Sequence, residues 1–543
     1  MPDATARVAR LAFRKGCLAM RLRDEIGVLF EDEQFVEAFP SRGGPGLSPG
    51  MLALVSVLQY AENLTDRQAA EQVKGRIDWK YALSLELEDP GFDFSVLCGF
   101  RARLIEHGLE EKILDMFLQR AKEMDLLRAG GLQRTDSTHV LAAIRTLNRM
   151  ELAGETLRAA LEAVTVAAPA WLAQVAPRAW FERYGGRVDA YRLPRAEGAR
   201  QDYLITVGQD GFALLEAIWT PEAPAWLRQL PAIEILRRTW VQQFHRGQDS
   251  GVSPRRAKDK DLPPGKLLLC SPYDPEARYS VKRGFEYIGY KVHLSEVCEP
   301  GQPHLITNVE TTHAAVGDVE MTGIIHTHQA KRAVKPGEHL VDAGYTSAEH
   351  LVSARAKAIN LVGPLQLSTS QQSKDGGRFA LPAFVIDFEH QHVTCPDGKT
   401  SSAWREETSR GAPLIRVAFR RNDCKPCSLR AQCTSTALGG QRRLTIRPQP
   451  LYEEIETARH NQDSDEWKER YAVRAGVEGT MNQAVRVTGV RTTRYRGLDR
   501  TRLAHVLTAT ALNVVRLDAW WTGTPISPTR ASHFARLGMA LAA

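Results

Sequence analysis

Three acidic residues lie far apart in this sequence, each in its own local context, and any fold must account for them. Asp136 stands within Arg-Thr-Asp-Ser-Thr, Asp342 within Leu-Val-Asp-Ala-Gly-Tyr, and Glu478 ends the run Tyr-Ala-Val-Arg-Ala-Gly-Val-Glu. Three carboxylates brought together can hold two hard divalent cations such as Mg²⁺. Two such metals can clamp the attacking and the leaving oxygen of a phosphodiester displacement. In a basic chain, this set predicts a metal-dependent enzyme that acts on DNA.

The local patterns predict an α/β core around these residues. Residues 132–140 read as a strand that ends near Asp136, and residues 339–342 as a short strand that delivers Asp342 to a glycine turn. Tyr471, Arg474 and Glu478 are spaced to share one face of a helix. Taken singly, each Asp could be a turn residue, and Arg474 with Glu478 an ordinary exposed pair. The glycines 476 and 479 beside Glu478 favour a close approach by another backbone or by DNA.

Composition sets the broad class. The chain has 543 residues, 43% of them apolar, which is too long for one domain and compatible with a sizeable core. No stretch approaches the roughly 20 apolar residues of a membrane span, and the basic N-terminus lacks the apolar run of a signal peptide, so a cytoplasmic protein is expected. The net charge of +7 is modest. Six arginines nevertheless crowd residues 486–502, as either a solvated cationic face or a track for DNA phosphates.

Four parts are expected along the chain. Residues 1–128 read as helical; Thr65 or Asp66 is a candidate N-cap, and the turn at Gly75 leads into a second helix. This pattern suits a helix-turn-helix reader of DNA, or any helical packing domain. Residues 129–368 would form the first part of the catalytic core, with a helical insert at about 147–268. Residues 369–450 would be an inserted cysteine-containing domain, and residues 451–543 would complete the core with the Glu478 helix and a C-terminal helix.

Four of the eight cysteines cluster, at Cys395, Cys424, Cys427 and Cys433. A C-x₂-C pair in a cytosolic protein indicates zinc or redox chemistry, and four thiolates would complete a closed tetrahedral zinc site. His390 and His392 are nearby substitute ligands. Free or buried thiols are the alternative interpretation.

Several short motifs in this order resemble those of one family. They are Arg-Thr-Asp136-Ser-Thr-His, the run Ser-Pro-Tyr-Asp-Pro-Glu-Ala-Arg-Tyr from Ser271, Gly289-Tyr-Lys-Val-His-Leu, Val-Asp342-Ala-Gly-Tyr, Cys424-Lys-Pro-Cys427, and Tyr471-Ala-Val-Arg-Ala-Gly-Val-Glu-Gly-Thr. Together they look like a bacterial insertion-sequence DDE transposase with an RNase H-like core, closest to the IS eleven-eighty-two family. The resemblance spans about residues 20–535, and it rests on the order of the motifs rather than on any single one.

The resemblance implies a multidomain α/β fold: an RNase H-like mixed-sheet core, an N-terminal all-helical DNA-binding domain, a helical insert and a Cys-containing insert. It implies that Asp136, Asp342 and Glu478 bind Mg²⁺ or Mn²⁺. Tyr471, Arg474 and Glu478 match three letters of the family's Tyr-Arg-Glu-Lys signature, but Val485 stands where the lysine is expected.

The expected activity is cleavage of the terminal inverted repeats of an insertion sequence and joining of the 3′-OH ends to target DNA. Such a protein would work as a dimer or larger assembly on DNA, in the bacterial cytoplasm and nucleoid. The residues expected to contact DNA are Tyr471, Arg474, Arg486, Arg491, Arg494 and Lys291. The alternatives are an RNase H-like nuclease without strand transfer and an inactive transposase-derived DNA-binding protein.

Overall fold

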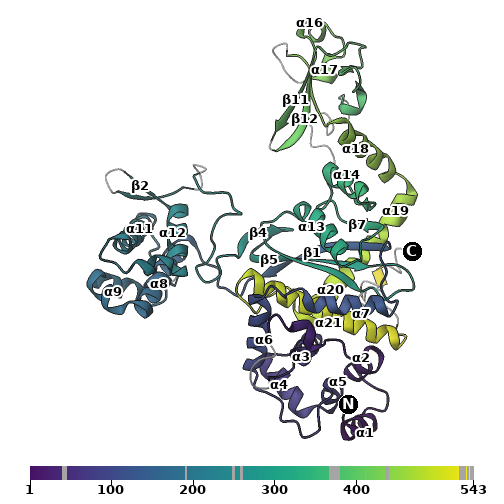
Figure 1. The fold of residues 1–543 in the computed structure, drawn as a ribbon. Coiled ribbons are helices and arrows are strands. Elements are labelled where there is room, and N and C mark those ends of the chain that lie inside the picture. Colours follow the sequence, from purple (N-terminus) through teal and green to yellow (C-terminus); the bar gives the residue numbers. More distant parts are fainter. Residues whose placement is uncertain are drawn as a thin grey trace.

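The computed structural model describes residues 1–39, 46–189, 193–247, 251–256, 261–365, 379–409, 411–434, 440–524, 534 and 537–538. A mixed β-sheet lies at the centre, with the N-terminal helices packed below it in the view of Figure 1. Two further parts project from this body, one helical and one containing the clustered cysteines. This sheet positions the strand that carries Asp136 and the strand that precedes Asp342.

Six strands form the central sheet: β1 (Leu132–Leu141), β4 (Arg278–Lys282), β5 (Phe285–Val297), β6 (Ile306–His313), β7 (Glu338–Leu340) and β8 (Asn360–Val362). Strand β5 pairs antiparallel with β4 and β6 along one edge and with β1 along the other. Strand β1 is parallel to β7, which is parallel to β8. The order is therefore β6-β5-β1-β7-β8, with β4 extending the β6 side.

Strand β1 runs through Asp136 to Leu141, so the expectation that the strand ends near Asp136 was wrong. The polar run after Asp136 stays extended because Ser137 to Leu141 pair with His293 to Gly289 of β5. Asp136 consequently lies in the middle of a strand in the middle of the sheet.

Helices cover both faces of the sheet (Figure 1). Helices α13 (Asp318–Lys331) and α14 (Ala348–Ala356) pack on one side, around a cluster that includes Val341 and Tyr345. Helices α20 (Gly476–Thr488) and α21 (Leu498–Trp521) pack on the other. Most of α21 is buried, as expected of a helix surrounded by protein on all sides.

The N-terminal helices are α1 (Asp3–Ala12), α2 (Leu18–Ile26), α3 (Pro49–Ala61), α4 (Asp66–Gly75), α5 (Ile77–Leu83), α6 (Ser95–Glu106) and α7 (Lys112–Glu123). One continuous core joins them to the sheet through α21, from Ala19 to Leu517. The N-terminal helices and the sheet therefore pack as one body, and residue 128 marks no break in this core.

Helix α4 begins where the sequence predicts, with Thr65 as its N-cap. The Thr65 hydroxyl accepts the Gln68 N–H at 3.2 Å, and the Gln68 side chain accepts the Thr65 N–H at 2.9 Å. Helix α5 follows after a single residue, but residues 78–82 within it are buried. The surface of α4, with Arg67 and Lys74 exposed, is the part of this pair that can meet another molecule.

The helical insert has a core of its own, which includes Leu157, Leu214 and Trp240. It contains α8 (Arg149–Ala167), α9 (Pro169–Val175), α10 (Arg178–Tyr184), α11 (Glu197–Trp219) and α12 (Pro231–Gln243), with the small hairpin β2 (Phe244–Arg246) and β3 (Val252–Pro254). It projects to the left of the sheet in Figure 1.

The cysteine-containing part also has a separate core. Its elements are β9 (Val385–Asp387), β10 (His392–Thr394), β11 (Ala403–Ser409), β12 (Ala412–Ala418), α16 (Arg421–Cys424), α17 (Arg430–Cys433) and β13 (Arg443–Ile446). Helices α18 (Gln449–Gln462) and α19 (Asp465–Ala472) lead the chain back to the sheet. The boundary expected at residues 368–369 lies outside the described residues.

Among the helices that the structure describes, none has the length and apolar character that a membrane span requires.

Candidate functional site

The register of two parallel strands brings Asp136 and Asp342 side by side. Arg134 of β1 is paired with Leu340, the last residue of β7. Asp136 lies two residues after Arg134, and Asp342 lies two residues after Leu340. Because β1 and β7 run in the same direction, the two aspartates lie at the same level of the sheet. The turn after β7 is held by the Gly344 N–H, which donates to Asp342 Oδ1 at 2.8 Å.

Glu478 joins them from α20, on the far side of a break in the helix. The chain runs from α19 through a short 3₁₀ segment at Val473–Ala475 into α20, so Tyr471, Arg474 and Glu478 do not share one regular helix. Gly476 sits at this break because a Cβ there would lie 2.0 Å from Arg134 Nη1. The sequence predicted a close approach at the glycines: it occurs at Gly476, from an arginine side chain, and a Cβ at Gly479 would meet no atom within 4 Å.

The guanidinium of Arg474 lies among all three carboxylates. Its Nη2 is 2.8 Å from Asp136 Oδ2 and 3.8 Å from Asp342 Oδ2, and its Nη1 is 3.8 Å from Glu478 Oε1. The side chains of Asp136, Asp342 and Glu478 are 17%, 38% and 60% exposed, so the group opens from the sheet toward solvent. The three residues selected from the sequence are thus brought together around one positive charge.

Burial raises the pKa of Asp136, and the neighbouring Asp342 adds to the rise, while Arg474 and the Ser137 N–H oppose it. Three acidic groups this close repel one another when ionised. A cation between them relieves that repulsion, and carboxylate oxygens are the ligands that Mg²⁺ prefers. The three carboxylates already surround a cationic group, but among the described residues only Glu111, Glu310 and His328 form a group whose ligand atoms all lie within 4.8 Å of one another, so the carboxylates would have to move closer to share one metal.

A fourth carboxylate, Asp318, stands behind the group and was missed in the sequence. Ser137 Oγ donates to Asp318 Oδ2 at 3.2 Å, and Lys291 Nζ donates to Asp318 Oδ1 at 3.0 Å. Lys282 Nζ donates to the Ser137 carbonyl at 2.7 Å. In the sequence, Asp318 has only the pattern of a helix start, because Glu320 accepts the Gly317 N–H. Lys291, expected to contact DNA, is engaged with Asp318 here.

A buried ionic cluster fixes α20 against β1. Glu296 of β5 is fully buried and accepts from Arg134 Nε at 2.6 Å and from Arg516 Nη1 at 2.7 Å. Thr480 also donates to Glu296, and Arg134 Nη1 donates to the Val473 carbonyl at 2.7 Å. Arg134 lies two residues before Asp136, and Thr480 two residues after Glu478. The cluster therefore holds the strand and the helix that carry two of the three carboxylates.

The other residues expected to contact DNA lie in different settings. Tyr471 is half-buried and stacks on Trp467 with ring centroids 4.8 Å apart. Arg491 is exposed and its Nε reaches Thr138 Oγ1 of β1 at 3.4 Å, close to Asp136. Arg494 instead donates to Asn63 and Leu64 in the N-terminal helices, at the start of α4.

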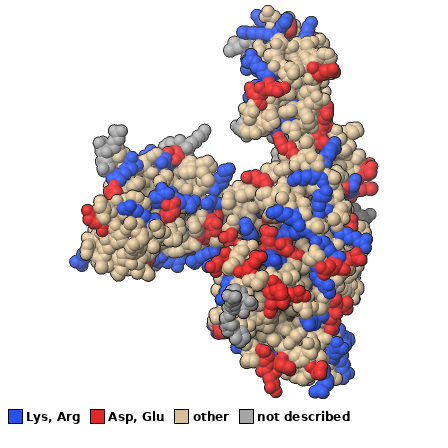
Figure 2. Space-filling model, viewed as in Figure 1, with Lys and Arg blue, Asp and Glu red and all other residues tan. Residues whose placement is uncertain are grey.

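The helix that carries Glu478 also carries an exposed arginine. Arg486 is exposed on α20. Val485, which stands where the family's signature has a lysine, packs against the main core. A charged lysine buried there would be costly. Figure 2 shows Lys and Arg side chains across the central body, interspersed with Asp and Glu. On this face the positive charge is therefore divided into small groups and does not form one uniform surface.

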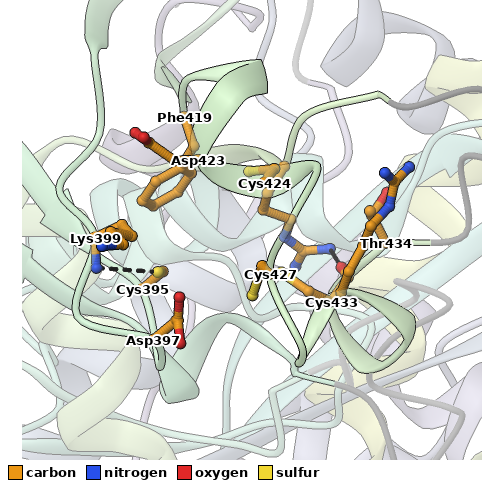
Figure 3. Close-up of a pocket in the computed structure, with 11 residues that line it drawn as sticks. Cys395, Asp397, Lys399, Phe419, Asp423, Cys424, Cys427, Cys433 and Thr434 are labelled. Carbon is orange, nitrogen blue, oxygen red and sulfur yellow. Dashed lines mark hydrogen bonds between the residues drawn. The ribbon is translucent and has the colours of Figure 1, made fainter.

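Two other groups could hold a metal. The clustered cysteines all line one small cavity in the projecting β-rich part (Figure 3). Glu111, Glu310 and His328 also converge, but His328 Nδ1 is 2.6 Å from Glu310 and Arg332 Nη2 is 2.7 Å from Glu111. The charges of this second group are already paired with cations of the chain itself.

Comparison with protein-family models gives two matches. Residues 394–518 match a family described as "Transposase DDE domain", and residues 17–103 match one described as "Transposase domain (DUF772)". The first match includes the four cysteines and Glu478, whereas Asp136 and Asp342 lie before it. No curated protein matches the chain.

These two matches support a transposase role for a chain whose structure is mixed α/β. More narrowly, the matches support a DDE transposase, a class that implies DNA as partner and a divalent metal as cofactor.

Proposed function

We propose that this chain is a DDE transposase of the IS eleven-eighty-two family with an RNase H-like core. The strand order β6-β5-β1-β7-β8 supports that core, with β1 antiparallel to β5 and parallel to β7. The observation that carries the proposal is the meeting of Asp136, Asp342 and Glu478 around Arg474. Asp136 comes from a strand, Asp342 from the turn after a second strand and Glu478 from a helix, and each is more than 130 residues from the next in sequence.

In this proposal Asp136 and Asp342 hold Mg²⁺ or Mn²⁺ between them, and Glu478 completes the ligand set from the helix side. Bound there, the metals supply Lewis acidity for activating water and for the leaving 3′ oxygen. Arg474 leaves the carboxylates and neutralises a phosphate near the scissile bond. Lys291 and Lys282, anchored by Asp318 and the Ser137 carbonyl, keep positive charge beside the same strand.

The proposed DNA path runs past Tyr471, past Arg491, which contacts Thr138 near Asp136, and past Arg486, which is exposed farther along α20. Arg494 serves a different role, because it ties the arginine-rich segment to the start of α4. The exposed face of α4 contacts the terminal inverted repeat in this scheme. Because phosphate contacts dominate such binding, affinity falls steeply with added salt.

The same active site first cuts the element end and then joins the 3′-OH to target DNA, without a covalent protein–DNA intermediate. Two ends must be brought together for this, so the proposal includes a dimer or a larger assembly on DNA.

The test is cleavage of a labelled duplex that carries the end of the element, with Mg²⁺ or Mn²⁺. We expect metal-dependent 3′-OH products that vanish in Asp342→Asn and in Glu478→Gln. The matched control is Glu466→Gln, which changes an exposed carboxylate on α19 and should leave cleavage unchanged. Cleavage that persists in both site variants would refute the assignment of the carboxylates.

A second assay separates the alternatives. With a pre-cleaved 3′-OH end and supercoiled target DNA, a transposase forms joined products, whereas a nuclease without strand transfer only cuts. Sequence-specific binding without cutting or joining, in the unaltered chain, would identify a DNA-binding protein derived from a transposase.

A further inference from the structure

The β-rich part that carries the clustered cysteines is small and has a limited core. Within the described residues, seven apolar side chains are buried in it: Phe384, Val393, Ile415, Val417, Phe419, Leu444 and Ile446. They lie between the hairpin of β9 and β10 and the three-stranded sheet of β11, β12 and β13. Domains of fewer than about 70–80 residues rarely gain enough from such a core alone, and most have a further cross-link.

One end of this part contributes little to the apolar core, where Cys395, Cys424 and Cys433 are only partly buried. Helices α16 and α17 are four residues long, and neither contains a buried residue. Helices this short are not stable by themselves in water. All four clustered cysteines lie at this end, three of them in or between these two helices.

The four thiols line one cavity of about 30 Å³ (Figure 3). Cys395 enters from the turn after β10, Cys424 and Cys427 from the end of α16 and the bend that follows, and Cys433 from the end of α17. All four are free thiols rather than disulfides. His390 and His392 are not among the lining residues, and His390 Nδ1 is 2.9 Å from Asp387.

Two hydrogen-bond donors line the cavity. The Lys399 N–H donates to Cys395 Sγ at 3.4 Å, across a turn in which Gly398 takes a φ of +75°. Burial raises the pKa of the Cys427 and Cys433 thiols, and Arg442 opposes that rise at Cys433. Arg442 lines the same cavity with only 8% of its surface exposed, and its Nε has no hydrogen-bond partner. Burying a cation with an unsatisfied donor costs free energy, and a negatively charged neighbour lowers that cost.

We infer that Cys395, Cys424, Cys427 and Cys433 bind one structural Zn²⁺ ion in tetrahedral geometry. Four thiolates form a closed site without an open position for substrate, and soft sulfur ligands select zinc over Mg²⁺. Binding releases the four thiol protons and leaves a site of net charge −2, in a cavity lined by Lys399, Arg430 and Arg442 as well as by Asp397 and Asp423. The ion then joins α16 and α17 to the turn after β10. This inference does not depend on the proposed function.

The test begins with the metal content of the full chain, purified under reducing conditions without added metal. We expect about one zinc per chain, the stoichiometry of a closed four-cysteine site. Cys424→Ser and Cys427→Ser should each lower that content to near zero. Cys98→Ser is the matched control, because Cys98 is an exposed thiol in α6, and it should retain the zinc.

A spectroscopic measurement on the unaltered chain covers the case in which the serine variants do not fold. Replacement of zinc by Co²⁺ should give the sulfur-to-cobalt charge-transfer band and the intense visible bands of a tetrahedral thiolate site. The zinc content should also be unchanged in Asp342→Asn and Glu478→Gln, which separates this site from the carboxylates. Absence of zinc together with full reaction of all four thiols in the native chain overturns the inference, as does a disulfide among them.

Discussion

The buried charge of Glu296 should be essential to the arrangement of the three carboxylates. Glu296→Gln keeps the shape of the side chain but removes the negative charge between Arg134 and Arg516. Removing one partner from a buried ion pair costs about 3–5 kcal/mol. Each arginine retains a backbone acceptor, at Val473 and at His304, so the expected loss is at the lower end, about 3 kcal/mol.

The control is Glu286→Gln on the same strand, where the side chain is exposed and the loss should stay within about 0.5 kcal/mol. Urea unfolding measures the change in the free energy of unfolding, and hydrogen exchange locates it. Peptides from β1 and α20 should lose protection in Glu296→Gln, while those from the helical insert, which has its own core, should not. A loss no larger than that of Glu286→Gln would refute the reasoning.

The pH dependence gives an independent check on the same residue. Burial alone would raise the pKa of Glu296, but Arg516 and Arg134 outweigh it and the net pKa lies below its usual 4.5. The stability that the carboxylate contributes is therefore fully present above the unfolded value of 4.5, and it is lost as the pH falls through the lower folded value. The difference in stability between the unaltered chain and Glu296→Gln should be constant near neutral pH and shrink in acid.

Local patterns were sufficient to predict the elements around the site. The capping pattern of Thr65 and Gln68 marks the start of α4. The Asp-Ala-Gly sequence predicts the turn after β7, where Gly344 donates to Asp342. Such signals are visible because they arise between residues a few positions apart.

The interactions that assemble the site are long-range, and local patterns do not reveal them. Glu296 lies in a strand and looks like a solvent-facing charge, but its partners are 162 and 220 residues away. The same applies to Asp318, whose role depends on Ser137 and Lys291. The break at Val473–Ala475 was missed because its cause is Arg134, which packs against Gly476 from another strand.

Packing also determines how the chain divides into parts with separate hydrophobic cores. Residues 1–128 have the sequence of a helical domain, yet their core is completed by α21 from the other end of the chain. The helical insert was visible as a helical pattern and the cysteine-containing part as a change in composition, and each has a core of its own. A core shared between distant segments leaves no such mark in the sequence.

Two further substitutions test the break before Glu478 and the charge between the carboxylates. Gly476→Ala places a Cβ 2.0 Å from Arg134 Nη1 and should destabilise the chain by about 1–3 kcal/mol. Gly479→Ala meets no atom within 4 Å and should stabilise it by up to about 1 kcal/mol; equal shifts in thermal unfolding would contradict this account of the break. Arg474→Ala removes the cation that lies 2.8 Å from Asp136. In the absence of DNA, Mn²⁺ should then bind about tenfold more tightly, because a pair this buried is worth on the order of 1–2 kcal/mol. Cleavage of DNA should nevertheless fall, since the same guanidinium is needed at the phosphate. Calorimetric titration with Mn²⁺ measures the first effect, and unchanged or weaker binding would mean that Arg474 does not occupy the place of the metal.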